Sequence, residues 1–174
     1  YVVNYRFYEP PSGSLRLEPA QLNFDMLTLL DGSPVLNQVF FDTGKSDISD
    51  NYVLLKHRAD TGAFHENTLT SATDRYKNVL NIVGRQLREV PEAQIRIVGC
   101  NSDSGVEKGN LELSKARAES VKGYLSSIWG IDGSRMTVDA RNLPAQPAPP
   151  KMLGSRAENQ RVDIIYDSGD MQAM

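Results

Sequence analysis

The sequence has no long hydrophobic run, since its apolar stretches are short and interrupted. One of the longest candidates, Met26 to Leu30, is broken by Thr28, whereas a helix that crosses a bilayer needs about 20 consecutive apolar residues. We therefore expect no membrane-spanning helix. The sequence starts at Tyr1 without a basic segment followed by an apolar one, so we expect that any export signal has been removed or lies outside it, and that the sequence is a fragment of a larger protein.

Cysteine, histidine and excess positive charge are also scarce. Cys100 is the only cysteine, which excludes an internal disulfide and a multi-cysteine zinc site and favours a buried apolar filler over a reactive thiol. The histidines, His57 and His65, lack the tight spacing of metal ligands, so we expect no metal and no other cofactor. A net charge of −3 offers no basic field for a phosphate backbone, which argues against a nucleic-acid partner.

Apolar periodicity predicts a series of strands and helices. Residues 71–89 and 114–130 repeat apolar residues at helical spacing, and Ser114 is a candidate cap for the second helix. Short apolar or alternating segments predict strands at 39–41, 94–99, 136–138 and 161–166. The resulting order β-α-β-α-β-β predicts an α+β, two-layer sandwich with a mixed sheet and helices packed on one face. The residues expected to share its core are Val83, Leu87, Ile95, Ile97, Ala118, Val121 and Leu125.

The remaining segments are interpreted as additions to one domain at residues 39–167. Residues 1–38 read as an N-terminal strand or linker extension, because a tyrosine-rich start is followed by prolines and glycines. Residues 51–69 show no continuous apolar face, so we expect an insertion that lies outside the shared core. Residues 168–174 are expected to form a C-terminal tail.

Three stretches of the sequence match a known family pattern in the family's own order: 39–46, 99–118 and 159–164. The most specific stretch is Asn110-x-x-Leu113-Ser114-x-x-Arg117-Ala118, which reproduces N-x-x-L-S-x-x-R-A without a gap. Over roughly residues 39–166 the chain therefore resembles the peptidoglycan-binding OmpA/Pal/MotB C-terminal domains.

The resemblance implies a site for the diaminopimelate side chain of peptidoglycan. Family members contact the ligand amine with the Asp of a G-H-T-D-x-x-G loop and a ligand carboxylate with the helix arginine, which here is Arg117. In this sequence the loop is Gly-Cys-Asn-Ser-Asp-Ser-Gly at 99–105, which places Ser102 at the family's Asp position and Asp103 one residue later. The family's N-R-R-V becomes Asn-Gln-Arg-Val at 159–162, so Gln160 replaces the first arginine. The ligand-binding candidates are Arg117, Asn110, Ser102, Asp103 and Gln160.

Each candidate also has a structural interpretation. Arg117, expected about three residues into its helix, either forms an anion site with free helix N–H groups or pairs with Asp103 or Glu107 of its own loop. Asp103 is either a shifted ligand carboxylate or a turn residue that bonds its own backbone. Asn110 either orients a ligand or ties down the loop before the helix.

The resemblance implies a non-catalytic module that tethers its parent protein to peptidoglycan on the periplasmic face of a Gram-negative envelope, with the parent associated with the outer membrane. Binding of the diaminopimelate-containing stem peptide is expected to be weakened, because a neutral contact from Ser102 is roughly half as strong as a charge-assisted one. The alternative is a degenerate domain that acts as a periplasmic scaffold for other envelope proteins. We expect no enzyme, because no base accompanies Ser102 in the sequence.

Overall fold

The structure, a computed structural model, describes residues 37–167. The predicted extension 1–38, apart from its last two residues, and the predicted tail 168–174 lie outside these residues. The described part contains the strands β1 (Gln38–Phe40), β2 (Ile95–Gly99), β3 (Met136–Ala140) and β4 (Arg161–Tyr166), and the helices α1 (Ala72–Lys77), α2 (Val79–Glu89), α3 (Leu111–Ser127) and α4 (Ser155–Asn159).

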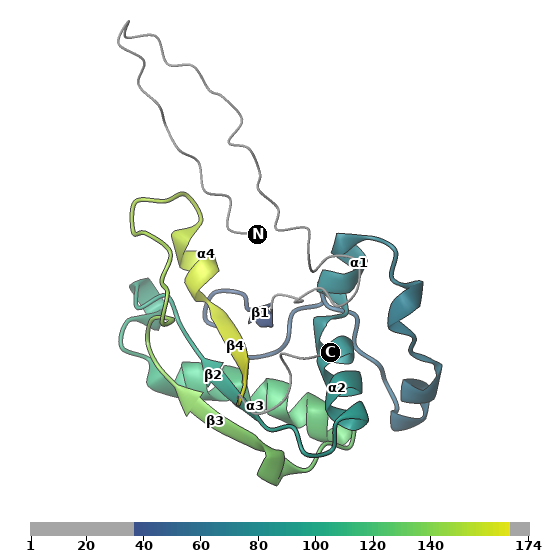
Figure 1. The fold of residues 1–174 in the computed structure, drawn as a ribbon. Helices are drawn as coiled ribbons and strands as arrows, with labels where there is room; N and C mark the ends of the chain where they lie inside the picture. Colours follow the sequence, from purple (N-terminus) through teal and green to yellow (C-terminus); the bar gives the residue numbers. More distant parts are fainter. Residues whose placement is uncertain (1–36, 168–174) are drawn as a thin grey trace, which may run out of the picture. The chain divides into compact units, whose positions relative to one another are not determined.

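The strands form one mixed sheet in the order β1-β4-β2-β3 (Figure 1). Strands β2 and β3 run parallel, while β4 is antiparallel to both β1 and β2. Parallel neighbours need a long crossover connection, and α3 provides it between β2 and β3. The prediction of an α+β fold with a mixed sheet is confirmed.

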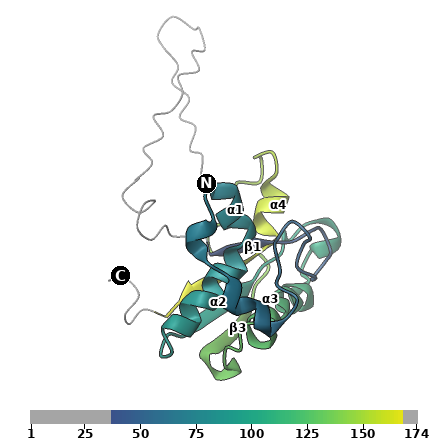
Figure 2. The same ribbon diagram turned by 90° about the vertical axis from the view of Figure 1, so that its right-hand side faces the viewer.

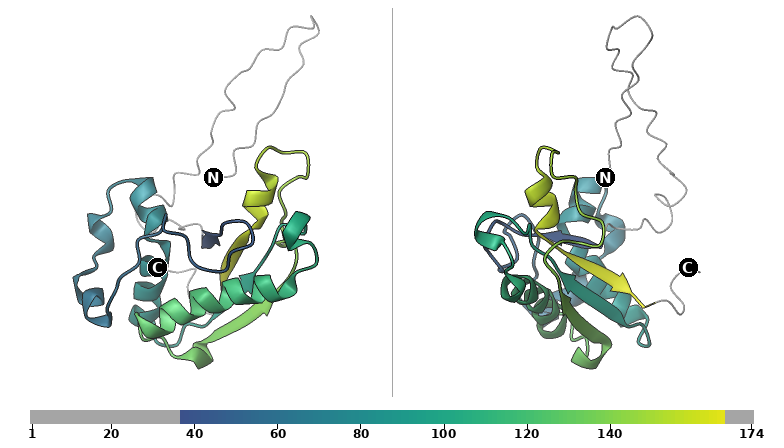
Figure 3. Two further views of the ribbon diagram at one scale, coloured as in Figure 1. Left: turned by 180° about the vertical axis from the view of Figure 1, so that it is seen from behind. Right: turned by 90° about the vertical axis from the view of Figure 1, so that its left-hand side faces the viewer.

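The two faces of the sheet differ in burial. Ile97 pairs with Ile164 of β4 and is fully buried, whereas the preceding residue Arg96 pairs with Ile165, and both are exposed. Successive side chains of a strand point to opposite faces, so Ile97 and Ile164 face the core while Arg96 and Ile165 lie on the opposite face, where Val98 is also buried. Helices α2 and α3 contact each other and the strands (Figure 2), and the view from behind shows α3 lying across the sheet (Figure 3).

The predicted core is confirmed, because every residue assigned to it is 0% exposed: Val83, Leu87, Ile95, Ile97, Ala118, Val121 and Leu125. Helix α3 approaches the end of β2 so closely that a Cβ added to Gly99 would lie 1.8 Å from the carbonyl oxygen of Ser114. A side chain at position 99 would therefore push the helix away. This contact fixes the start of α3 beside the loop that follows β2.

The start of α3 differs from the prediction that Ser114 caps it. The helix begins at Leu111, and the side-chain oxygen of Asn110 accepts a hydrogen bond of 3.0 Å from the backbone N–H of Leu113. Ser114 is instead buried inside the helix, so the cap assignment is wrong. Arg117 consequently lies in the second turn, deeper than expected, where its own helix has no free N–H groups to offer an anion.

The predicted helix 71–89 is divided into α1 and α2 at Asn78. Its N-cap is Ser71, whose side chain accepts a hydrogen bond from the backbone N–H of Asp74. The backbone of Asn78 leaves helical geometry (φ −100°, ψ 14°), and its side chain donates to the carbonyl oxygen of Asp74 at 2.9 Å. This competing hydrogen bond explains the break.

Part of the segment 51–69 enters the fold, contrary to the expectation that it lies outside the core. Tyr52 is 6% exposed, and its phenol oxygen accepts a 2.8 Å hydrogen bond from the backbone N–H of Phe40. Thr61 is 8% exposed and accepts a hydrogen bond from Arg88 of α2. Most of the other residues in the segment are exposed, so the segment is a surface connection anchored at a few points.

Candidate functional site

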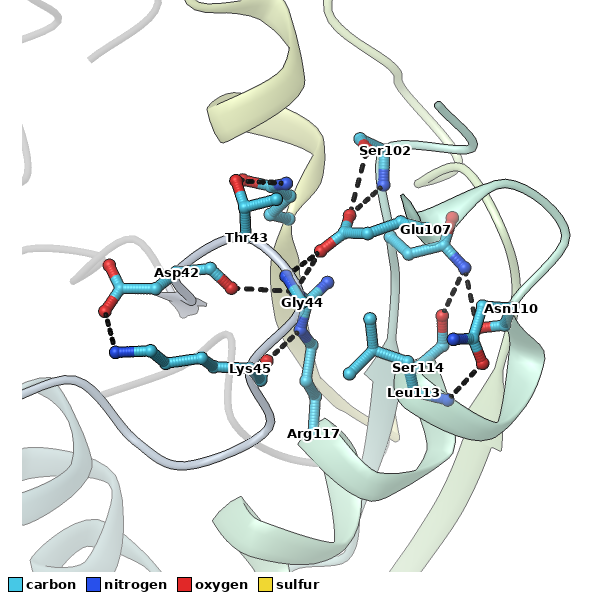
Figure 4. A network of polar contacts seen from close by, with 12 residues as sticks. Asp42, Thr43, Gly44, Lys45, Ser102, Glu107, Asn110, Leu113, Ser114 and Arg117 are labelled. Atoms are coloured by element: carbon cyan, nitrogen blue, oxygen red, sulfur yellow. Dashed lines mark hydrogen bonds and ion pairs between the residues drawn. The ribbon is translucent and has the colours of Figure 1, made fainter. Parts of the chain in front are cut away.

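Three of the ligand-binding candidates, Ser102, Asn110 and Arg117, lie where two loops meet the first turns of α3 (Figure 4). One loop follows β1, the other follows β2 and leads into α3. Both loops sit at strand ends, where the sheet holds their backbones in place. The two loops and the helix together enclose the side chain of Arg117.

The guanidinium of Arg117 is fully buried and hydrogen-bonded on several sides. Its Nε donates to the carbonyl oxygen of Lys45 at 2.8 Å, Nη1 to that of Cys100 at 2.9 Å and Nη2 to that of Asp42 at 3.1 Å. Nη2 also forms an ion pair of 2.5 Å with Oε1 of Glu107, and both side chains are 0% exposed. The buried cation is thus neutralised by a carboxylate of the same chain.

The carboxylate of Glu107 receives hydrogen bonds on both oxygens. Oε1 accepts from the backbone N–H of Gly44 at 2.8 Å and from Arg117, and Oε2 accepts from the backbone N–H and the hydroxyl of Ser102, both at 2.9 Å. Burial alone would raise the pKa of this carboxyl, but these hydrogen bonds outweigh burial and lower the pKa from 4.5 to about 2. Glu107 is therefore ionised over the whole physiological pH range.

This arrangement links two of the candidates that the sequence pointed to. Ser102, which is 7% exposed, reaches Arg117 only through the carboxylate of Glu107. Of the two loop acids considered as partners for Arg117, it is Glu107 and not Asp103 that pairs with it. We call the four residues Gly44, Ser102, Glu107 and Arg117 the carboxylate pocket.

Asp103 and Asn110 are exposed and bond the loop backbone. Oδ1 of Asp103 accepts from the backbone N–H of Gly109 at 2.9 Å, and the Asp103 backbone has φ 46°, a left-handed conformation that Asp tolerates. The carbonyl oxygen of Asn110 accepts from the side chain of Asn101. Both residues hold the loop before α3 in shape.

Gln160 lies beside the loop that follows β1. Its side chain forms hydrogen bonds with Thr43 of that loop and not with the side chains of the carboxylate pocket. It is 3% exposed, and its Nε2 donates to the hydroxyl of Thr43 at 3.0 Å. Thr43 and Gln160 also line an open hollow of about 550 Å³ together with residues 150–157, which include Lys151 and Arg156.

Two structural residues of the site were not singled out from the sequence. Asn101 is 0% exposed, and its side-chain nitrogen donates to the hydroxyl of Ser114 at 2.9 Å and to the carbonyl oxygen of Asn110. Gly44 adopts φ 71°, which suits glycine and presents its N–H to Glu107. In the sequence, Glu107 is marked only by its position between two glycines, Gly105 and Gly109. Its burial cannot be predicted from this position, because it depends on partners far away in the sequence such as Gly44.

Other reactive residues do not join the pocket side chains. Cys100 is 0% exposed, as predicted, and burial raises the pKa of its thiol to about 12. His57 and His65 are exposed, and residues 37–167 contain no group of three potential ligands that could hold a metal ion. Within the same range, no helix is both long and apolar enough to span a bilayer.

Known proteins are similar to this chain in sequence. Outer membrane protein Omp38 of Acinetobacter baumannii is 33% identical over 125 residues, which cover 72% of this chain and 28% of that protein. The peptidoglycan-binding protein ArfA of Mycobacterium bovis is 33% identical over 92 residues, which cover 51% of this chain and 27% of that protein. The chain therefore spans less than a third of the length of either relative.

Comparison with solved structures supports the same fold. The peptidoglycan-associated lipoprotein from Burkholderia pseudomallei matches with a TM-score of 0.50 at 22% identity, over 75% of this chain and 90% of that one. The sequence pattern of the OmpA family matches residues 63–160, which is more than half of the 174 residues. This match includes α3 with Asn110 and Arg117, and we conclude that the chain belongs to the OmpA family.

Proposed function

We propose that this domain is a non-catalytic module that tethers its parent protein to peptidoglycan, on the periplasmic side of the cell envelope and in association with the outer membrane. Membership of the OmpA family supports this, as do relatives whose names describe an outer membrane protein and a peptidoglycan-binding protein. The observation that carries the proposal is the geometry of a carboxylate receptor beside the start of α3, in which Arg117 and the backbone N–H groups of Gly44 and Ser102 hold a carboxylate.

The ligand that we propose is the diaminopimelate-containing stem peptide, bound weakly around Arg117, Asn110, Ser102, Asp103 and Gln160. Weak binding follows from what these side chains already do. The guanidinium of Arg117 has a carboxylate partner within the chain, and Gln160 is neutral and bonded to Thr43. A ligand carboxylate therefore competes with an existing ion pair.

A second candidate function is a periplasmic scaffold that binds other envelope proteins and not the wall. The specific observation in its favour is that both members of the Arg117–Glu107 pair are 0% exposed. A fully satisfied buried pair needs no ligand to be stable. The two functions differ in whether the domain binds isolated cell wall.

Co-sedimentation of the purified chain with peptidoglycan sacculi separates them. We expect a fraction of the chain to pellet with diaminopimelate-containing sacculi, and free diaminopimelate, but not lysine, to release it. Lysine is the matched competitor because it keeps both amines of diaminopimelate and lacks only the second carboxylate. If no chain pellets with the sacculi, the scaffold function takes its place.

A variant at position 160 tests the location of the contact. Gln160→Arg introduces a cation, and a charge-assisted contact contributes about 1.5–3 kcal/mol, so we expect roughly tenfold tighter binding of the stem peptide. Gln160→Ala is the control, because it also removes the hydrogen bond to Thr43 but adds no charge. Equal affinity for both variants would place the contact elsewhere.

A further inference from the structure

The donors of the carboxylate pocket are held in place independently of the residue that fills it. Gly44 belongs to the loop after β1, Arg117 to α3, and Ser102 directly follows the segment anchored by Asn101. The carbonyl oxygens of Asp42 and Lys45 orient the guanidinium without any help from Glu107. These parts form a receptor for one carboxylate group.

The carboxylate that fills the receptor comes from a short surface turn. Glu107 ends a three-residue 3-10 turn, Gly105–Glu107, and both Gly105 (φ 57°) and Gly109 (φ 66°) have left-handed backbone conformations. Val106, in the middle of the turn, is 77% exposed. The turn is therefore attached to the domain mainly through the side chain of Glu107.

We propose that Glu107 is an internal ligand: it occupies a carboxylate-binding site formed by Gly44, Ser102 and Arg117, and the site takes a small carboxylate from solution when the Glu107 carboxylate is removed. The site recognises both oxygens, because two donors face Oε1 and two face Oε2. Formate and acetate offer the same pair of oxygens, whereas chloride cannot engage both sides. This inference concerns the chain's own carboxylate and holds whether or not the domain binds peptidoglycan.

The physical basis is the charge of the buried guanidinium. In Glu107→Ala the cation keeps its bonds to backbone carbonyl oxygens but loses the carboxylate that pairs with it among residues 37–167, while the N–H groups of Gly44 and Ser102 lose their acceptor. Unpaired buried charges and donors are costly. A carboxylate that binds the folded state alone then raises the stability by mass action.

The test is thermal unfolding of the 174-residue chain carrying Glu107→Ala, in sodium chloride and in sodium formate or acetate at equal ionic strength and pH 7. Formate should raise the unfolding midpoint of the variant in a saturable manner, by roughly 3–6 °C at a concentration about tenfold above its Kd. The midpoint of the wild type should not respond. Equal responses of wild type and variant, or none in the variant, would overturn the proposal.

A matched control removes a different paired carboxylate. Glu89 pairs with Arg85 at 2.7 Å on the surface of α2, and its side chain is 57% exposed. Glu89→Ala therefore removes an ion-paired glutamate without opening a buried site. Formate should leave the unfolding midpoint of this variant unchanged. If formate raised it as much as that of Glu107→Ala, the salt would stabilise the protein without binding the pocket, and the proposal would be wrong.

A double variant decides the matter if Glu107→Ala does not fold in either salt. Ser102→Asp/Glu107→Ala introduces a carboxylate at residue 102, whose hydroxyl contacts Oε2 of Glu107 in the wild type. We expect the double variant to be folded and to lose its response to formate. A double variant that remains unfolded would contradict a receptor that accepts carboxylates from another source.

Discussion

The two ends of α3 are fastened to the domain by different chemistry. Its first turns hold the carboxylate pocket, where the Arg117–Glu107 ion pair is 0% exposed. Near its last turn, a network of neutral groups surrounds the side chain of Asn81, which is also 0% exposed. In this asparagine network, Oδ1 of Asn81 accepts from the phenol of Tyr124 at 2.6 Å and from the indole of Trp129 at 3.4 Å, while Nδ2 donates to the carbonyl oxygen of Val53 at 2.8 Å.

The difference determines how each end responds to its surroundings. A neutral network depends on shape and on complete hydrogen bonding, and it does not change its protonation in acid. The charged pocket depends in addition on the ionisation of Glu107, and we propose that it accepts another carboxylate once that of Glu107 is removed. Ligand binding in the domain is therefore expected at the charged end, with the neutral end serving as its rigid support.

The largest expected effect comes from removing the pocket carboxylate. Glu107→Ala should lower the free energy of unfolding by about 3–5 kcal/mol in chloride, because it leaves a buried guanidinium without its anion. Denaturant unfolding followed by circular dichroism measures this change. Glu89→Ala, at an exposed pair, should cost about 0–1 kcal/mol, and a similar cost for both variants would show that burial adds nothing to the Arg117–Glu107 pair.

The second prediction is that the pH dependence of stability differs between the two ends of α3. The folded-state pKa of Glu107 is about 2 against an ordinary value of 4.5, so its contribution is present above about pH 4.5 and is lost as the pH falls to about 2. In that window the unfolded chain binds a proton that the folded chain does not. The stability difference between wild type and Glu107→Gln should therefore shrink across it, as measured by unfolding at successive pH values. A constant difference would mean that Glu107 does not titrate with a lowered pKa.

The positions of the strands and helices could be predicted from the sequence more accurately than the contacts at the two ends of α3. Strands and helices follow from local apolar spacing, and all seven residues that we expect to share the core are buried. The cap at Asn110 was missed because Ser114 looks equally suitable when only neighbouring residues are considered. The break at Asn78 depends on one side-chain hydrogen bond within an otherwise helical pattern.

The interior of the site could be predicted only in part. The motif on α3 identified Arg117, and Glu107 was one of two acids considered as its partner. Their complete burial depends on carbonyl oxygens of Asp42 and Lys45, which lie far away in the sequence, in the loop after β1. A pattern of neighbouring residues cannot predict contacts between residues that are far apart in the sequence. The contact of Tyr52 with Phe40 was not predicted for the same reason.

A smaller effect is expected at the neutral end. Asn81→Ala removes the acceptor of Tyr124 and Trp129 and should cost about 1–3 kcal/mol, the usual cost of unsatisfied buried donors. This cost should stay constant between pH 4.5 and 2, in contrast to that of Glu107→Gln. Asn67→Ala, at an exposed position, is the matched control and should change stability by less than about 0.5 kcal/mol. If the stability loss caused by Asn81→Ala became smaller at acidic pH, the proposed difference between the two ends of α3 would be wrong.

The smallest expected effect concerns Tyr52, which anchors the chain just before Val53 joins the asparagine network. The backbone N–H of Phe40 faces away from β4 in the register of this sheet, and it donates instead to the phenol oxygen of Tyr52 at 2.8 Å. Tyr52→Phe leaves that N–H on the edge of β1 without its acceptor, so we expect a loss of about 0.5–1.5 kcal/mol and faster hydrogen exchange at the Phe40 amide. Tyr76→Phe is the control, because it removes only the 2.8 Å hydrogen bond between the two phenols and leaves the acceptor of Phe40 in place. Faster exchange in both variants alike would mean that the aromatic packing, and not the Tyr52 hydroxyl, protects this edge of the sheet.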